Sequence, residues 1–190
     1  MRFSLREIKE LLKAWILISL AFAIAFGGLR LDASMLVVLG VSLFTVGIGF
    51  VLHELAHKFV AQRYGAQAEF RAFNQMLVFA LVTSLFGIIL AVPGAVFITS
   101  PLRRDQHGKV ALAGPLTNAV LALGFAAMVV LFPWSAPVAS FGLRVNAWLG
   151  LFNLIPFLGA DGEKVLAWHK GVYAVSITVA SFVMVLAYLV

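Results

Sequence analysis

Residues 34–65 read SMLVVLGVSLFTVGIGFVLHELAHKFVAQRYG, and this stretch indicates which kind of fold the chain adopts. It is apolar over most of its length and contains no proline, and about 20 apolar residues cross a bilayer as a helix. Gly65 is typical of a helix stop. The last third contains His53-Glu54-Leu55-Ala56-His57. The stretch therefore predicts a transmembrane helix with a polar motif at its inner end.

The composition of the whole chain supports a membrane environment. Of the 190 residues, 63% are hydrophobic and 12% are charged, whereas a soluble domain has about 25% charged residues. The net charge of +6 is distributed in short basic clusters between apolar segments, which is typical of membrane proteins and not of a nucleic-acid surface. We therefore expect the lipid bilayer as a partner and no nucleic acid. Cysteine is absent, so any zinc must be bound through nitrogen and oxygen.

The apolar segments predict the fold class. We expect an all-α polytopic membrane protein with about five to six transmembrane helices and a re-entrant loop or short β-hairpin near the active site. The 190 residues are predicted to form one integral-membrane domain, with a catalytic core at about 34–170. The predicted apolar helices cover 14–29, 34–64, 76–90, 110–132, 141–157 and 172–190, and a strand-like run covers 95–99.

The distribution of basic residues bears on the path of residues 76–99. If this segment enters and leaves the membrane on one side, twelve of the 14 lysines and arginines lie on the cytoplasmic side and only Arg30 and Arg144 lie opposite. The positive-inside rule favours this re-entrant path over a full crossing. It also places Asp161 on the same side as His53 and His57. We therefore expect a multi-pass cell-membrane protein with a cytoplasmic N-terminus and an active site toward the cytoplasm.

The HELAH motif combines metal ligands with a base. His53 and His57 are four residues apart, so both imidazoles project from one face of a helix and can bind one ion. Glu54 is adjacent and is predicted to be the general base that takes a proton from the attacking water. Three ionisable groups in a membrane helix are costly, at roughly 2.5–3.5 kcal/mol for each charged group. A solvated helix end is the alternative explanation of the motif.

Asp161 is the best candidate for a third ligand. A catalytic zinc has three protein ligands and an open position. Pro156 prevents a regular helix before Asp161, while Gly159 and Gly162 allow the backbone to turn the carboxylate inward. The other candidates fit less well: His107 and His169 in basic loops, Asp32 on the opposite side, and Asp105 among arginines. We expect one Zn²⁺ per chain.

Asn153 is the other polar residue in this region. Its amide has the donors to steady substrate backbone or an oxyanion. Capping of the broken helix is an equally good interpretation. Asn153 is therefore a predicted catalytic residue with a structural alternative.

The two motifs together resemble those of the site-2 protease family of intramembrane metalloproteases. The resemblance rests on His53-Glu54-x-x-His57 with Asn153-x-x-Pro156-x-x-x-x-Asp161-Gly162, and on Gly114-Pro115-x-x-Asn118 between them. It covers roughly 34–170 and implies zinc at the cytoplasmic side and single-span transmembrane proteins as substrates. It also implies that residues 91–99 present a strand edge to an unwound substrate. No PDZ-like stretch is recognised, so the chain resembles a minimal core of the family.

Two other functions remain open from the sequence. One is a membrane protein that binds zinc without catalysis, although a structural site does not need Glu54. The other is a metal transporter or channel, in which polar residues recur along several helices at successive depths. Here the polar residues gather at one level. The leading hypothesis is an intramembrane zinc protease that cleaves within or near transmembrane helices.

Overall fold

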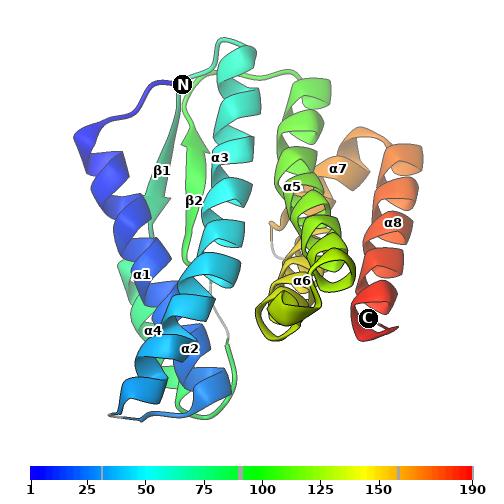
Figure 1. Ribbon diagram of the computed structural model, residues 1–190. Helices are drawn as coiled ribbons and strands as arrows, with labels where there is room; N and C mark the ends of the chain where they lie inside the picture. The colour runs from blue at the N-terminus through cyan, green and yellow to red at the C-terminus, as the bar shows by residue number, and fades with distance from the viewer. Residues whose placement is uncertain (31, 90–91, 158, 190) are drawn as a thin grey trace. The chain divides into compact units, whose positions relative to one another are not determined.

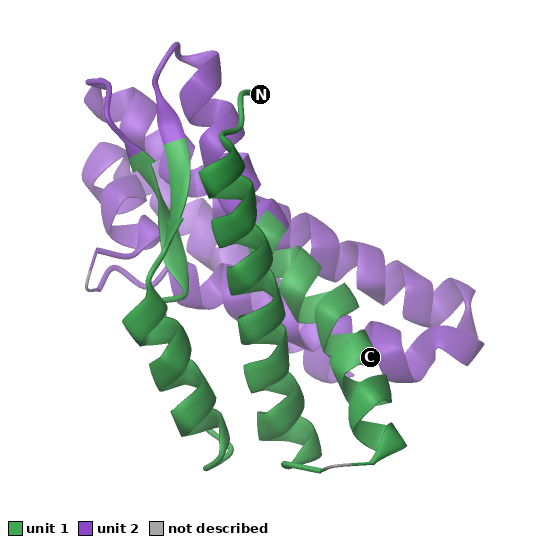
Figure 2. Ribbon diagram, turned by 90° about the vertical axis from the view of Figure 1, so that its left-hand side faces the viewer, with its two compact units in different colours: residues 1–51, 69–97 green, residues 52–68, 98–190 purple. Residues whose placement is uncertain are grey.

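A computed structural model describes residues 1–30, 32–89, 92–157 and 159–189. These residues divide into two compact units, one of 1–51 and 69–97 and one of 52–68 and 98–190 (Figure 2). The elements in chain order are α1 (Leu5–Gly27), α2 (Ala33–Ser42), a π-helical turn (Leu43–Gly47), α3 (Ile48–Arg63), β1 (Ala68–Ala72), α4 (Asn74–Ser84), β2 (Gly94–Ile98), α5 (Arg104–Leu131), a short 3-10 turn (Pro133–Ser135), α6 (Ala136–Asn153), α7 (Asp161–Trp168) and α8 (Lys170–Leu189) (Figure 1).

The protein is a mostly helical membrane protein, as predicted. Among the described residues, four helical segments are long and apolar enough to cross a membrane: Leu5–Gly27, Ala33–Arg63, Arg104–Leu131 and Lys170–Leu189. The second joins α2, the π turn and α3 into one segment of 31 residues. α4 is a shorter apolar helix of 11 residues.

The first helix begins earlier than its apolar pattern indicates. α1 starts at Leu5, and the side chain of Ser4 accepts a hydrogen bond from the Glu7 amide as its N-cap. The predicted start at residue 14 missed these turns because they carry charges. Arg6 and Glu10 form an ion pair one helical turn apart, 2.9 Å between Nε and Oε1, and such pairs support a polar helical turn.

Two short strands form the sheet, of which the sequence predicted only the second. Hydrogen bonds from Phe73 N to Pro93 O and from Thr99 N to Gln67 O, both 3.0 Å, lie at opposite ends of the antiparallel pair β1–β2. The Phe73–Pro93 bond joins the two ends of the segment that contains α4. Because those ends are adjacent, the segment returns to the level at which it began. This favours a re-entrant path over a single crossing.

The other edge of β1 is covered by carboxylates of α1. Oε1 of Glu7 accepts a hydrogen bond from Phe70 N at 2.9 Å, and Oε2 of Glu10 accepts one from Ala72 N at 3.0 Å. Phe70 and Ala72 alternate with the residues that pair with β2, so their amides point away from it. Glu7 is fully buried. The two carboxylates thus satisfy backbone donors that would otherwise be left open in an apolar environment.

The second unit packs α5 against α6 and α8. Its core contains Ala122 and Phe125 of α5, Ala139 and Leu143 of α6, and Val183 of α8. α3 ends at Arg63, and Gly65 follows it with φ 78°. Hydrogen bonds from Gly65 N to Gln62 O and from Ala66 N to Ala61 O complete the cap. This left-handed cap is the helix stop that the sequence predicted.

Candidate metal centre

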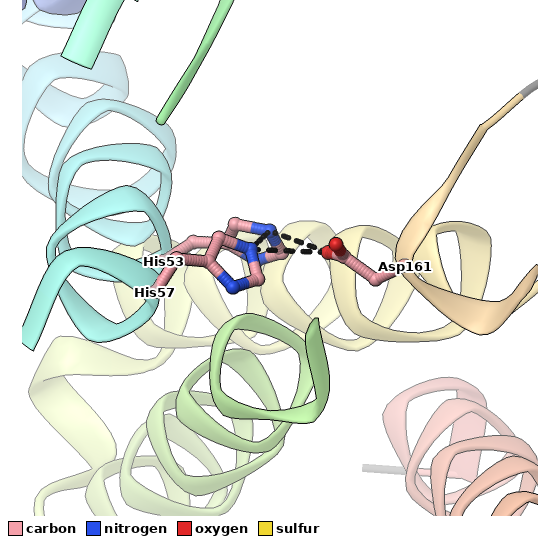
Figure 3. Close-up of side chains that lie close together, drawn as sticks. All are labelled: His53, His57 and Asp161. Atoms are coloured by element: carbon pink, nitrogen blue, oxygen red, sulfur yellow. Dashed lines mark hydrogen bonds and ion pairs between the residues drawn. The ribbon is translucent and has the colours of Figure 1, made fainter. Parts of the chain in front are cut away.

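Three side chains converge in the second unit. Nε2 of His53 and Nε2 of His57 lie 3.0 Å apart. Oδ2 of Asp161 lies 3.3 Å from the former and 3.1 Å from the latter (Figure 3). All three residues are buried. Among the described residues, they are the one group of three or more His, Cys, Asp or Glu donors in which every donor atom lies within 4.8 Å of the others.

The spacing of these donor atoms fits zinc. Bonds of 2.0–2.1 Å at tetrahedral angles place two ligand atoms about 3.3 Å apart. The observed separations of 3.0–3.3 Å are close to this value. The nitrogen and oxygen donors also match the set that zinc accepts without cysteine.

Gly114 of α5 leaves room at the converging atoms. A β-carbon at this position would lie 2.4 Å from Nε2 of His57 and 2.5 Å from Nε2 of His53. Any other residue would therefore fill the space that the two nitrogens face. The donor atoms of His53, His57 and Asp161 therefore fit a zinc ion. Because glycine has no side chain, Gly114 leaves the space for that ion open.

His57 is oriented by the backbone. Its Nδ1 lies 2.7 Å from the carbonyl oxygen of Val110, which can only accept a hydrogen bond. Nδ1 therefore carries the proton, and Nε2 offers a lone pair. Pro115 lies within α5 and has no N–H to donate to the carbonyl of Ala111, the residue next to Val110.

His53 is oriented by side chains. Its Nδ1 lies 2.5 Å from Oδ1 of Asn118 on α5. Nδ2 of Asn118 donates to Oδ1 of Asn146 on α6 at 3.1 Å, and Nδ2 of Asn146 donates to the carbonyl oxygen of Gly142 at 2.9 Å. Both asparagines are fully buried. In the sequence, Asn118 stands out only as part of the Gly-Pro motif, and no sequence signal identified Asn146.

Asp161 is placed by a close turn of the chain. α6 ends at Asn153, Gly159 adopts φ 78°, and Asp161 is the first residue of α7. Gly162 approaches Leu154 so closely that a β-carbon would lie 2.0 Å from the Leu154 carbonyl oxygen. The two glycines therefore allow the turn, as expected from the sequence.

The surroundings of Asp161 favour the carboxylate. Burial raises the pKa of this group, but when the imidazoles are doubly protonated the charge of His57 and hydrogen bonds from both rings lower it by more. The pKa consequently lies well below its ordinary value. Lys164 Nζ lies 3.6 Å from Oδ1, the oxygen that does not face the histidines.

The two predicted catalytic residues do not belong to this group of donors. Glu54 is buried beside His53 on α3, which suits a base that is not a ligand. Asn153 is half-buried, and its Nδ2 donates to the Leu149 carbonyl oxygen of its own helix at 2.9 Å. This bond uses one of the two amide protons, and the other remains for the predicted oxyanion contact.

Three residues that the sequence made weaker candidates for the third zinc ligand do not belong to this group of donors. Asp105 forms ion pairs with Arg103 at 3.1 Å and with Lys109 at 3.3 Å, as expected for an acid among basic residues. Nδ1 of His169 accepts a hydrogen bond from Val172 N at 3.2 Å. His107 is exposed.

Several known proteins are similar in sequence. "Putative zinc metalloprotease MJ0611" of Methanocaldococcus jannaschii is 40% identical over 179 residues, which make up 92% of this chain and 90% of that protein. "Zinc metalloprotease MJ0392" of the same archaeon is 27% identical over 124 residues, 63% of this chain and 31% of that protein. "Putative zinc metalloprotease YwhC" of Bacillus subtilis is 25% identical over 143 residues, 64% of this chain and 65% of that protein. No family model and no solved structure matches the chain.

The fold, the three donors and the relatives agree on a class. The protein is a zinc metalloprotease and a mostly helical membrane protein. More particularly, the chain belongs to the site-2 protease-like family. The predicted family is thereby confirmed.

Proposed function

We propose that this protein is an intramembrane zinc protease that hydrolyses peptide bonds within or near the transmembrane helices of substrate proteins. One observation supports this most directly. Two of the three donors, His53 and His57, lie on a helical segment of 31 residues that is itself a candidate membrane span. A buried hydrolytic centre on such a helix is suited to substrates that are also in the bilayer.

The residues of the centre have distinct roles. His53, His57 and Asp161 would bind one zinc ion per chain. Zinc in such a site supplies a Lewis acid for the scissile carbonyl and makes water acidic enough to attack near neutral pH. The Glu54 carboxylate accepts the proton of the attacking water and delivers it to the nitrogen of the leaving amine. The remaining amide proton of Asn153 donates to the oxyanion that forms on the scissile carbonyl.

Substrate capture is assigned to the outer edge of β2. A helical substrate must unwind before attack, because its carbonyls are engaged in backbone hydrogen bonds. One edge of β1 pairs with β2 and the other is covered by Glu7 and Glu10. The register of the pair leaves the backbone groups of Gly94, Val96 and Ile98 on the outer side of β2. An extended substrate segment would add there as a third strand.

The membrane arrangement follows from charge. We propose a multi-pass protein of the cell membrane whose N-terminus and active site face the cytoplasm, because the basic residues then lie almost entirely on that side. The substrates would be proteins with a single transmembrane helix. A re-entrant path for the segment that contains α4 is supported by the hydrogen bond between Phe73 and Pro93.

A cleavage assay in lipid tests the function. Purified protein is reconstituted in liposomes with zinc and a set of single-span substrates, beside the E54Q variant. We expect wild type to cleave within or near the span and E54Q to retain zinc while losing activity about 10²- to 10⁴-fold, the usual contribution of a general base. Cleavage by E54Q at the wild-type rate contradicts the mechanism. Zinc binding without cleavage of any single-span substrate contradicts the proposed function.

A proline substitution tests the capture edge. V96P removes an amide that points away from β1, and proline is tolerated at such an edge position. We expect slower cleavage of helical substrates with unchanged zinc content, whereas V96T keeps the amide and serves as the control. Equal cleavage by V96P and V96T contradicts capture at this edge.

A further inference from the structure

A chain of hydrogen bonds through two asparagine side chains lies behind His53. It has a defined donor-to-acceptor direction, which the proposed reaction does not explain. It passes from His53 on α3 through Asn118 on α5 to Asn146 on α6 and ends at the Gly142 carbonyl, with separations of 2.5, 3.1 and 2.9 Å. Both asparagines are fully buried. An asparagine presents either its oxygen or its nitrogen to a neighbour, so the direction of each amide has to be determined by a partner.

The Gly142 carbonyl determines the first direction. A backbone carbonyl only accepts hydrogen bonds, so the Asn146 amide must turn its nitrogen toward Gly142. Its oxygen then faces Asn118 and needs a donor. Asn118 must consequently present its nitrogen to Asn146, which leaves its oxygen facing His53.

The Asn118 oxygen in turn determines which ring nitrogen of His53 carries the proton. The Asn118 oxygen accepts and cannot donate, so Nδ1 of His53 must carry the proton. Nε2 then offers its lone pair toward Nε2 of His57 and Oδ2 of Asp161. A flip of the Asn118 amide would place a donor against Nδ1 and favour a proton on Nε2, which blocks metal binding.

We propose that Asn118 and Asn146 are positioning residues, a relay of fixed polarity from the Gly142 carbonyl that holds the proton of His53 on Nδ1 and leaves Nε2 for the metal. The inference rests on the metal site of the proposed function. Neither asparagine touches the metal or the substrate in this role. Asn146 acts through the orientation of Asn118.

A double-mutant cycle distinguishes this relay from simple packing. N118L and N146L each remove the orientation, and loss of such a partner weakens metal binding about 10- to 100-fold. N118D retains an acceptor for His53 on both of its oxygens, so Asn146 is no longer needed. We expect N146L to weaken zinc binding about tenfold or more in the wild-type background and less than about twofold in the N118D background. If Asn146 only filled space, N146L would weaken zinc binding by the same factor in both backgrounds.

The measurements are zinc affinity, by competition with a chelating dye, and the position of the His53 proton, by nitrogen NMR of the labelled protein with and without zinc. T117V is the matched control on α5, because the Thr117 hydroxyl donates to the Ala113 carbonyl of its own helix. We expect Nδ1–H at His53 in wild type and T117V, and a loss of that preference in N146L. Circular dichroism and size-exclusion elution identify any variant that does not fold.

Three results would overturn the relay. They are a proton on Nε2 of His53 in wild type, an unchanged His53 proton in N146L, and an equal cost of N146L in both backgrounds. The first needs no variant and so is independent of variant folding. None of them depends on a substrate: an intact relay without proteolysis contradicts the proposed function alone, and proteolysis with a failed cycle contradicts the relay alone.

Discussion

The two histidines of the centre are oriented in different ways. Behind His57, Nδ1 contacts a backbone carbonyl, that of Val110, at 2.7 Å. Behind His53, Nδ1 contacts the side chain of Asn118, which is itself supported by Asn146. The first arrangement depends on the course of α5, and the second depends on two particular residues.

This difference predicts how substitutions will act. A backbone carbonyl remains when its side chain is changed, so the orientation of His57 is insensitive to the residue at 110. The orientation of His53 can be lost by one substitution at either of two positions. Features that both histidines share, Gly114 and Asp161, should have the largest effects of all.

Substitution of Gly114 should have the largest effect on metal content. G114A places a methyl group 2.4–2.5 Å from both Nε2 atoms, so zinc should fall to background. G124A is the matched control on the same helix, because a β-carbon at Gly124 meets nothing within 4 Å. Metal analysis after purification measures both variants. Stoichiometric zinc in folded G114A would contradict the metal position between the histidines.

Removal of the third donor should be nearly as severe. D161A takes away the oxygen that lies 3.1 Å and 3.3 Å from the two nitrogens. We expect zinc affinity to fall by more than about 100-fold, beyond the 10- to 100-fold range of an outer-shell partner. Competition with a chelating dye gives the value. Equal zinc in D161A and wild type would remove Asp161 from the ligand set.

The two histidine environments can be compared directly with one variant each. N118L should weaken zinc binding about 10- to 100-fold. V110A leaves the carbonyl that His57 contacts, so its zinc affinity should change by less than about twofold. V110A also removes apolar contacts at a buried position, and its stability should fall by about 1 kcal/mol or more. A large zinc effect of V110A would mean that packing, and not the carbonyl, orients His57.

The contact of Lys164 should have the smallest effect. Its amine lies 3.6 Å from the outer oxygen of Asp161 and its side chain is half exposed. Exposed ion pairs contribute about 0–1 kcal/mol, which limits the change in zinc affinity of K164M to about fivefold. A tenfold or greater loss would mean that Lys164 fixes the carboxylate in place.

The sequence allowed much of the fold to be predicted. Apolar length located the four candidate spans, because the lipid requires continuous apolar side chains. It also marked 76–90 and 141–157, whose helices α4 and α6 are not among those four, so among the described residues the expected five to six spans were too many. Gly65 and Pro156 marked helix ends through local backbone constraints. β1 and α7 were missed because each is short. β1 is stabilised by partners far along the chain, since Glu7 and Glu10 bind its amides, and α7 begins with a close turn in which Gly162 packs against Leu154.

The sequence by itself determined the membrane class, the family motifs and the pairing of His53 with His57, because helical periodicity fixes which residues share a face. Only the tertiary structure brought Asp161 to within 3.1–3.3 Å of both histidines and Gly114 against them. It also decided that His57 binds a carbonyl and His53 an asparagine relay. Local periodicity does not specify contacts between helices, and the direction of a hydrogen-bond chain depends on which acceptor lies at its end.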